Sequence, residues 1–179
     1  VVVMQGGAYY ETPGGTLTER NDTWEFDGAD WAPAAVASPG PTAIQHQMVY
    51  DSINERMVMY ANTETWILKN DAWSLLATDN SPGARERHAM AYDSWRGAVV
   101  LFGGSNSSGE HSTWLFDGTD WQDASPQHSP LETIYSGGMV FDSQAGHFVF
   151  FGGSGCAKAY CGETWLYGPF GLSADGDVD

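Results

Sequence analysis

Short apolar stretches separated by turn residues recur along the chain, and they are most regular between residues 85 and 121. The stretches in this segment that the pattern predicts to be β-strands are 88–92, 99–102, 113–116 and the residues from Trp121 onward. The first alternates large and small side chains, and the second is continuously apolar. Turn residues at 93–97 and at Asp117-Gly118 separate them, and Asp-Gly is a strong hairpin signal. The pattern predicts a meander of four antiparallel strands.

The same pattern repeats along the chain. His46-x-Met48-x-Tyr50-Asp51-Ser52 recurs as His88-x-Met90-x-Tyr92-Asp93-Ser94, and a Thr-Trp pair occurs four times, at Trp24, Trp66, Trp114 and Trp165. Seven residues later a second tryptophan follows in three copies, at Trp31, Trp73 and Trp121. The intervals between Thr-Trp pairs, 42, 48 and 51 residues, fit one blade of a β-propeller. We expect these seven tryptophans to pack between neighbouring blades.

The repeat resembles the kelch motif of β-propellers of the galactose oxidase and kelch type, in which an apolar strand ends in Gly-Gly and the next strand carries a Trp. The diglycine stands at Gly6-Gly7, Gly103-Gly104 and Gly152-Gly153, whereas the second copy has Ala61-Asn62. The resemblance covers about residues 1–168. It implies an all-β, kelch-like β-propeller segment of about 3.5 four-stranded antiparallel blades, at about 1–37, 38–80, 81–130 and 131–170. It specifies a fold and leaves the function open.

Both ends of the repeat are expected to be incomplete. The first blade begins at its second strand, and Pro169 stands where the other copies have the hairpin residue, so no fourth strand is expected there. Since kelch propellers have five to seven blades, the chain resembles a piece of a longer protein. The acidic tail, 171–179, carries Asp175, Asp177 and Asp179, which resemble the start of a calcium loop in a truncated neighbouring module. The sequence predicts no cofactor, with calcium as the alternative.

The net charge of −16, from 23 acidic and 7 basic side chains, disfavours nucleic acids and anionic membranes as partners. A cationic partner, bound calcium or plain solubility are all compatible with it. No apolar run reaches the roughly 18 residues needed to span a bilayer, so no membrane insertion is predicted.

The only two cysteines, Cys156 and Cys161, stand close together between two predicted strands. This spacing predicts a short loop closed by a disulfide, and hence an oxidising, extracellular or cell-surface location. No histidine or second cysteine pair stands nearby at the spacing of a zinc site.

The long connecting segments all fall at one end of the predicted blades, and the tight turns fall at the other end. The long segments are 8–22, 32–45, 77–87, 105–112, 125–135 and 154–163. Because loops carry recognition more often than the scaffold does, we expect binding on this long-loop face. The candidate ligand-binding residues there, all expected to be exposed or half-exposed, are Tyr9, Tyr10, Glu11, Arg85, Arg87, His111, His128 and Tyr160. Trp95, at a tight turn outside the repeat-locked positions, is a further candidate contact.

Residues that suggest chemistry have simpler explanations. Asp51, Asp93 and Asp142 recur at a turn position, where a carboxylate accepts hydrogen bonds from backbone N–H groups, so they are interpreted as turn caps rather than a catalytic constellation. His46 and His88 share one strand position and are interpreted as hydrogen-bonded packing residues rather than metal ligands or bases. No catalytic residue is therefore assigned.

The sequence thus predicts a non-catalytic extracellular or cell-surface module. It would present loops to a protein or glycan, or assemble with itself through open blade edges. The alternative is an enzyme domain of the oxidase or glycosidase kind, with an active site at the hub of the blades that lies mostly in blades outside this sequence.

Overall fold

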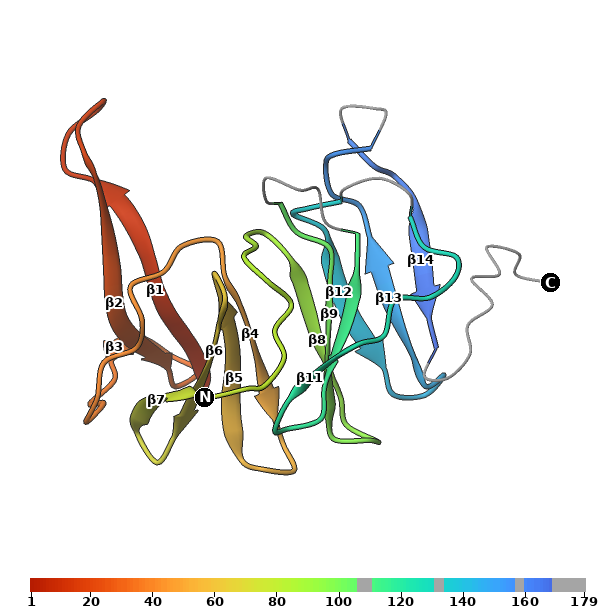
Figure 1. Ribbon diagram of the computed structural model, residues 1–179. Helices are drawn as coiled ribbons and strands as arrows, with labels where there is room; N and C mark the ends of the chain where they lie inside the picture. Colours follow the sequence, from red (N-terminus) through yellow and green to blue (C-terminus); the bar gives the residue numbers. More distant parts are fainter. Residues whose placement is uncertain (106–110, 131–133, 157–159, 169–179) are drawn as a thin grey trace.

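The structure is a computed structural model that describes residues 1–105, 111–130, 134–156 and 160–168. Within these residues it is all-β, with fourteen strands in four antiparallel sheets and no helix (Figure 1). Fourteen strands equal three and a half four-stranded blades, and consecutive sheets stand side by side, as in part of a β-propeller. The predicted fold class is confirmed.

Each sheet is a meander whose strands follow chain order. Sheet 1 comprises β1 (Val2–Tyr10), β2 (Leu17–Phe26) and β3 (Trp31–Pro33). Sheet 2 comprises β4 (Gln47–Asp51), β5 (Arg56–Ala61), β6 (Glu64–Lys69) and β7 (Ala72–Leu76). Sheet 3 comprises β8 (Ala89–Asp93), β9 (Ala98–Phe102), β10 (Thr113–Phe116) and β11 (Trp121–Asp123). Sheet 4 comprises β12 (Gly138–Asp142), β13 (His147–Phe151) and β14 (Thr164–Tyr167).

Strand β9 is continuously apolar because both faces of sheet 3 are covered. All five of its residues are buried. Val99 and Leu101 pack with residues of sheet 2, whereas Val100 packs against Phe148 of sheet 4. Side chains on opposite faces of one strand therefore belong to two different interfaces, which is how sheets stack around a propeller.

The recurrent aspartates cap the tight turns, as predicted. Asp93 Oδ1 accepts hydrogen bonds from the backbone N–H groups of Trp95 and Arg96, at 2.8 and 3.1 Å. Asp142 Oδ1 does the same for Gln144 and Ala145, at 2.8 and 3.1 Å. These N–H bonds hold the pKa of Asp142 below its usual value.

The first hairpin corrects one prediction. Residues 8–22 were expected to be a loop, but β1 and β2 continue together as far as the pair Tyr10–Leu17. The pairing shifts between Gln5 and Gly7, and both Gly6 and Gly7 have positive φ, at 62° and 105°. The diglycine here forms a β-bulge, and β1 stays paired with β2 beyond it, so it does not end the strand. The extended hairpin projects above the other sheets at the upper left of Figure 1.

The described part of sheet 4 holds three strands. The prediction about Pro169, and the acidic tail with Asp175, Asp177 and Asp179, fall outside the described residues. In the described part of the chain, no helix is long and apolar enough to cross a membrane.

Candidate functional site

Neighbouring sheets are joined by one repeated contact between a tryptophan and a threonine. Trp73 of β7 in sheet 2 donates its indole N–H to Thr23 Oγ1 of β2 in sheet 1, at 2.9 Å. Trp121 of β11 in sheet 3 donates in the same way to Thr65 Oγ1 of β6 in sheet 2, at 2.7 Å. Both indoles are almost completely buried, with 2% and 1% of their surface exposed. The last strand of sheets 2 and 3 is thereby fixed onto the next-to-last strand of the sheet before it.

Aromatic rings surround the buried indole of Trp121. Tyr60 meets it edge-on, with ring centroids 5.4 Å apart, and Phe116 lies 5.1 Å away. The hydroxyl of Tyr60 in turn donates to the carbonyl of Gly83, at 2.9 Å. Trp121 is therefore both hydrogen-bonded and packed against two rings at the interface between sheets 2 and 3.

The repeated contact is incomplete at both ends of the described chain. Trp31 of sheet 1 is 42% exposed and contacts Phe26 of its own sheet. The prediction that all seven repeat-locked tryptophans pack between blades is therefore wrong for Trp31, because no sheet in the described residues precedes sheet 1 to cover it. At the other end, Thr164 of β14 is exposed, although it occupies the position of the buried Thr23 and Thr65.

A groove lies between parts of sheets 3 and 4, at the place where each of the other two interfaces holds an indole. Its narrow inner part, with a volume of about 40 Å³, is lined by Phe102, Thr113, His128 and Trp165, among others. A wider outer part of about 720 Å³ adjoins it, and Tyr167 lines both parts. Thr113 is the counterpart of Thr23 and Thr65, and nothing in the described residues hydrogen-bonds its side-chain hydroxyl.

The remaining repeat-locked tryptophans are half-buried. Trp66, Trp114 and Trp165 pack against core clusters, as predicted. The indoles of Trp24, Trp66 and Trp114 each donate to the side chain two residues earlier, namely Asp22, Glu64 and Ser112, at 2.7 to 3.1 Å.

A buried polar cluster lies near the inner ends of sheets 2 and 3. His88 is 1% exposed and packs edge-on against Tyr60, with ring centroids 5.6 Å apart. Burial, with the nearby charges of Arg85 and His46, lowers the pKa of His88 to about 3, so the imidazole is neutral. Its two nitrogens have no hydrogen-bond partner in the described residues. The predicted packing role is confirmed, but the predicted hydrogen bonding is not found.

Arg85 also lies in this cluster, and the prediction that it is exposed is wrong. It is 2% exposed, and its guanidinium donates to the carbonyl oxygens of Gly103, at 3.0 Å, and Pro82. A third donation reaches Ser112 Oγ, at 3.3 Å. Backbone carbonyls thus compensate the charge, and the side chain joins the segment before β8 to the connection that follows β9.

Arg87 marks a second repeated contact, at the inner ends of the sheets. Its backbone N–H donates to the carbonyl of Gln45, at 2.7 Å, and the N–H of Ser136 donates to the carbonyl of Arg87, at 2.8 Å. All three residues have positive φ, between 57° and 60°. The exposed side chain of Arg87 also donates to Gln45 Oε1, at 2.9 Å.

The other candidate residues are exposed but dispersed. Tyr9 and Tyr10 lie on β1 rather than in a loop, with Glu11 just beyond, and Arg20 lies 4.5 Å over the ring of Tyr9. Tyr160 is 80% exposed and His111 is exposed. Trp95 is 56% exposed, yet it packs edge-on against Phe141 of sheet 4, 5.9 Å away. Among the candidates, His128 lines the groove between sheets 3 and 4.

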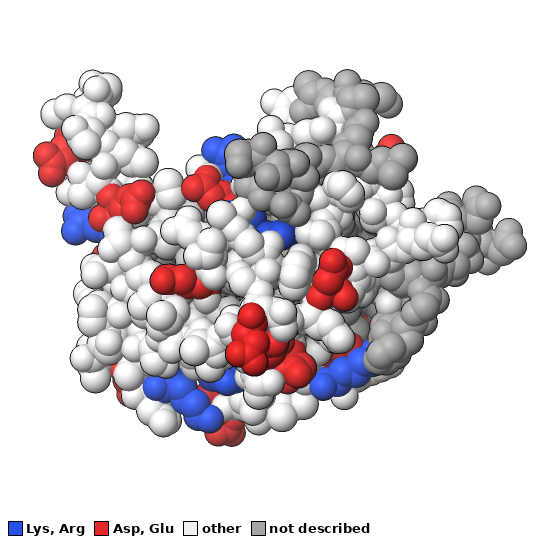
Figure 2. Space-filling view, in the orientation of Figure 1, with Lys and Arg blue, Asp and Glu red and all other residues white. Residues whose placement is uncertain are grey.

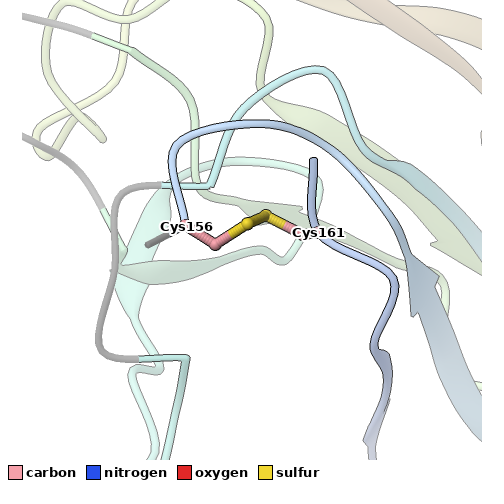
Figure 3. The surroundings of a disulfide bond; sticks show 2 residues. All are labelled: Cys156 and Cys161. Atoms are coloured by element: carbon pink, nitrogen blue, oxygen red, sulfur yellow. A yellow bond between two sulfur atoms is a disulfide. The ribbon is translucent and has the colours of Figure 1, made fainter. Parts of the chain in front are cut away.

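The predicted disulfide between Cys156 and Cys161 is present (Figure 3). The N–H of Cys161 donates to the carbonyl of Gly153, at 3.0 Å, and its side chain packs against the core beside Phe150. The disulfide therefore fixes the connection before β14 and indicates an oxidising environment.

Carboxylates are scattered over the face seen in Figure 2. In the part of the chain that the structure describes, no three His, Cys, Asp or Glu residues come together as a metal site.

The residues that sequence reasoning missed are the threonines. The Thr-Trp pair was visible four times, but only the tryptophan was interpreted. Within each pair, the threonine at Thr23 or Thr65 receives the indole of the next sheet, and Thr113 lies in the groove. Their recurrence directly before the tryptophan was the signal that could have identified them.

Comparison with known proteins supports the fold and goes no further. No family model matches the sequence, and no curated protein matches it. Among solved structures, 109 chains match, which makes the fold a common one. One, described as "Structure of YjhT", has a TM-score of 0.63 and 13% identity, covering 85% of this chain and 50% of that chain. The chain thus spans about half the length of that structure, and at this identity the likeness shows the fold alone.

Proposed function

We propose that the chain is part of a kelch-like propeller and acts as a non-catalytic association module of a secreted or cell-surface protein. The observation that carries the proposal is the exposure of Trp31, at 42%, beside 2% for Trp73 and 1% for Trp121. The same side chain that joins sheets inside the molecule is presented to solvent at its first sheet. An exposed indole beside an open sheet is a typical protein-binding feature.

The two ends of the molecule are complementary. Sheet 1 offers an indole donor without a threonine, and sheet 4 offers the exposed Thr164 without an indole. Sheet 1 of one copy can therefore follow sheet 4 of another and repeat the internal contact. Such a head-to-tail contact is heterologous, and it closes a ring or continues as a filament according to its rotation. The disulfide supports an oxidising location for this assembly.

Light scattering over a range of protein concentrations tests this proposal. The wild-type chain should exceed its monomer mass of 19.4 kDa, and Trp31→Ala should return it to that mass. Trp95→Ala is the matched control, because Trp95 is also exposed but lies at a tight turn. Since each copy carries a net charge of −16, raising the salt concentration from about 0.02 to about 0.5 M should strengthen association.

A wild-type chain that stays monomeric at every concentration and salt level would refute self-association. A mass that Trp31→Ala leaves unchanged would show that the contact lies elsewhere.

A further inference from the structure

We propose that the groove between sheets 3 and 4 is a binding site for an extended polypeptide segment that carries a tryptophan. The segment would add to β14 as a fourth strand of sheet 4 and place its indole against Thr113. This inference rests on the proposed function as an association module, and it names a second site and the chemistry of its partner.

The walls of the groove reproduce those that enclose Trp121. Around Trp121, Tyr60 of sheet 2 and Phe116 of sheet 3 supply the ring contacts, and Thr65 accepts the indole N–H. The repeat places Phe102, Tyr167 and Thr113 at the same three positions, and all three line the inner part of the groove. An indole is the group that these positions hold between sheets 2 and 3.

Thr113 supplies the polar group that such an indole needs. It is 2% exposed, and its backbone carbonyl and N–H are engaged by Ala124 and Ser125. Thr113 lines the inner part of the groove, and nothing in the described residues hydrogen-bonds its hydroxyl. At the other two interfaces the equivalent hydroxyl accepts an indole N–H at 2.7 or 2.9 Å. The groove leaves this hydroxyl open to a donor that enters from outside.

The edge beside the groove can pair with a further strand. Within the described residues β14 lies at the edge of sheet 4, whereas β6 and β10 are paired on both sides. The outer part of the groove, about 720 Å³, is lined by Tyr167 at the end of β14 and by Gln122 and Asp123 of β11, so both apolar and polar groups face it. Strand addition to an exposed edge is a common mode of peptide recognition, with side-chain pockets giving the specificity.

A peptide with the sequence of residues 71–77, blocked at both ends and labelled with fluorescein, is a suitable probe. It contains β7 with Trp73, a fourth strand of this fold, and it carries a single acidic residue, which limits repulsion by the acidic protein. Fluorescence anisotropy with the whole chain in its Trp31→Ala form, confirmed as monomeric, keeps this test separate from self-association.

The peptide should bind, and replacing its Trp73 by alanine should weaken binding by at least about tenfold. Thr113→Val in the protein should weaken it by a similar factor, whereas Thr113→Ser, which retains a hydroxyl, should restore most of the affinity. Thr16→Val is the control and should have no effect, because Thr16 is an exposed threonine between β1 and β2 and lies neither on β14 nor in the groove.

Absence of binding, equal binding of the alanine peptide, or indifference to Thr113→Val would each overturn this assignment. Failure of the proposed self-assembly would leave the peptide experiment unaffected, because it is performed on monomers. If Thr113→Val dissociated an oligomer that Trp31→Ala left intact, the occupant of the groove would be a second copy of the chain. That result would also overturn the assignment.

Discussion

The two middle sheets and the two end sheets derive from the same repeat, but they differ in how their strands are covered. Strand β5 in sheet 2 has four buried residues out of six, and β9 in sheet 3 has five out of five. In contrast, β1 in sheet 1 has a single buried residue out of nine, and β14 in sheet 4 has none. The difference shows that a blade of this repeat is completed by its neighbours, as in other repeat architectures.

The largest expected effect contrasts Trp121 with Trp31. Trp121→Ala removes a buried indole and leaves a cavity, and we expect it to lower the free energy of unfolding by about 3–5 kcal/mol. Trp31→Ala removes an exposed indole and should lower it by less than about 1 kcal/mol. Urea denaturation of both variants measures the contrast, and equal losses would contradict the difference in coverage.

The second prediction concerns how His88, in the middle of the molecule, makes the free energy of unfolding depend on pH. Its pKa is lowered to about 3 in the fold, so below pH 6.5 the unfolded chain binds a proton that the folded chain does not. The free energy of unfolding should therefore fall as pH falls from 6.5 to 4.5, by up to about 1.4 kcal/mol per pH unit. His88→Leu should flatten this slope in denaturant titrations.

Sheet 4 has Gly137 at the position of His88, and the ring of Phe150 leaves no room there for a side chain. The end sheet therefore contributes no titrating group at this place. A slope that His88→Leu leaves unchanged would indicate that other groups cause it. The chosen pH range lies above the ordinary pKa of the carboxylates.

The third prediction compares two threonines at the same repeat position. Thr65→Val leaves the buried indole N–H of Trp121 without an acceptor and should cost about 1–3 kcal/mol. Thr113→Val leaves no indole unpaired and should cost clearly less. Thermal or urea unfolding of the two variants decides the matter, and a larger loss for Thr113→Val would mean that its hydroxyl is already engaged.

The smallest expected effect sharpens the comparison among the tight turns. Glu55 has a φ of 52°, where sheets 3 and 4 have Gly97 at 69° and Gly146 at 75°. Glu55→Gly should stabilise the chain by about 1 kcal/mol, because a left-handed conformation is strained for glutamate. Asn62→Gly is the control, since asparagine tolerates a positive φ, and it should change stability less. Unfolding midpoints that fall for Glu55→Gly would count against strain at this turn.

The local elements were largely predictable from the sequence, because each is determined by residues close together in the chain. The strand 113–116 matches β10, and Asp93 and Asp142 cap their turns as expected. The groove was not predictable, because it depends on which residues of separate repeats meet. The Trp121–Thr65 contact joins residues 56 positions apart, and only its recurrence at Trp73–Thr23 hints at it.

The individual candidate residues were predicted less well, for a physical reason. Arg85 was expected on a solvent-exposed loop, but backbone carbonyls compensate its charge inside the molecule. Sequence pattern alone does not indicate where such carbonyls converge. The prediction for Trp31 was wrong for the opposite reason, because its repeat position leads to burial only when another sheet covers it.

Hydrogen exchange of the indole N–H groups, followed by NMR on ¹⁵N-labelled protein, tests most directly whether the tryptophan–threonine contact joins the sheets. The indole protons of Trp73 and Trp121 should exchange most slowly, on the time scale of global unfolding. The indole proton of Trp31 should exchange rapidly in the monomer, at a protein concentration low enough to prevent self-association. Fast exchange at Trp73 and Trp121, or protection of Trp31 in a monomer equal to theirs, would contradict the account.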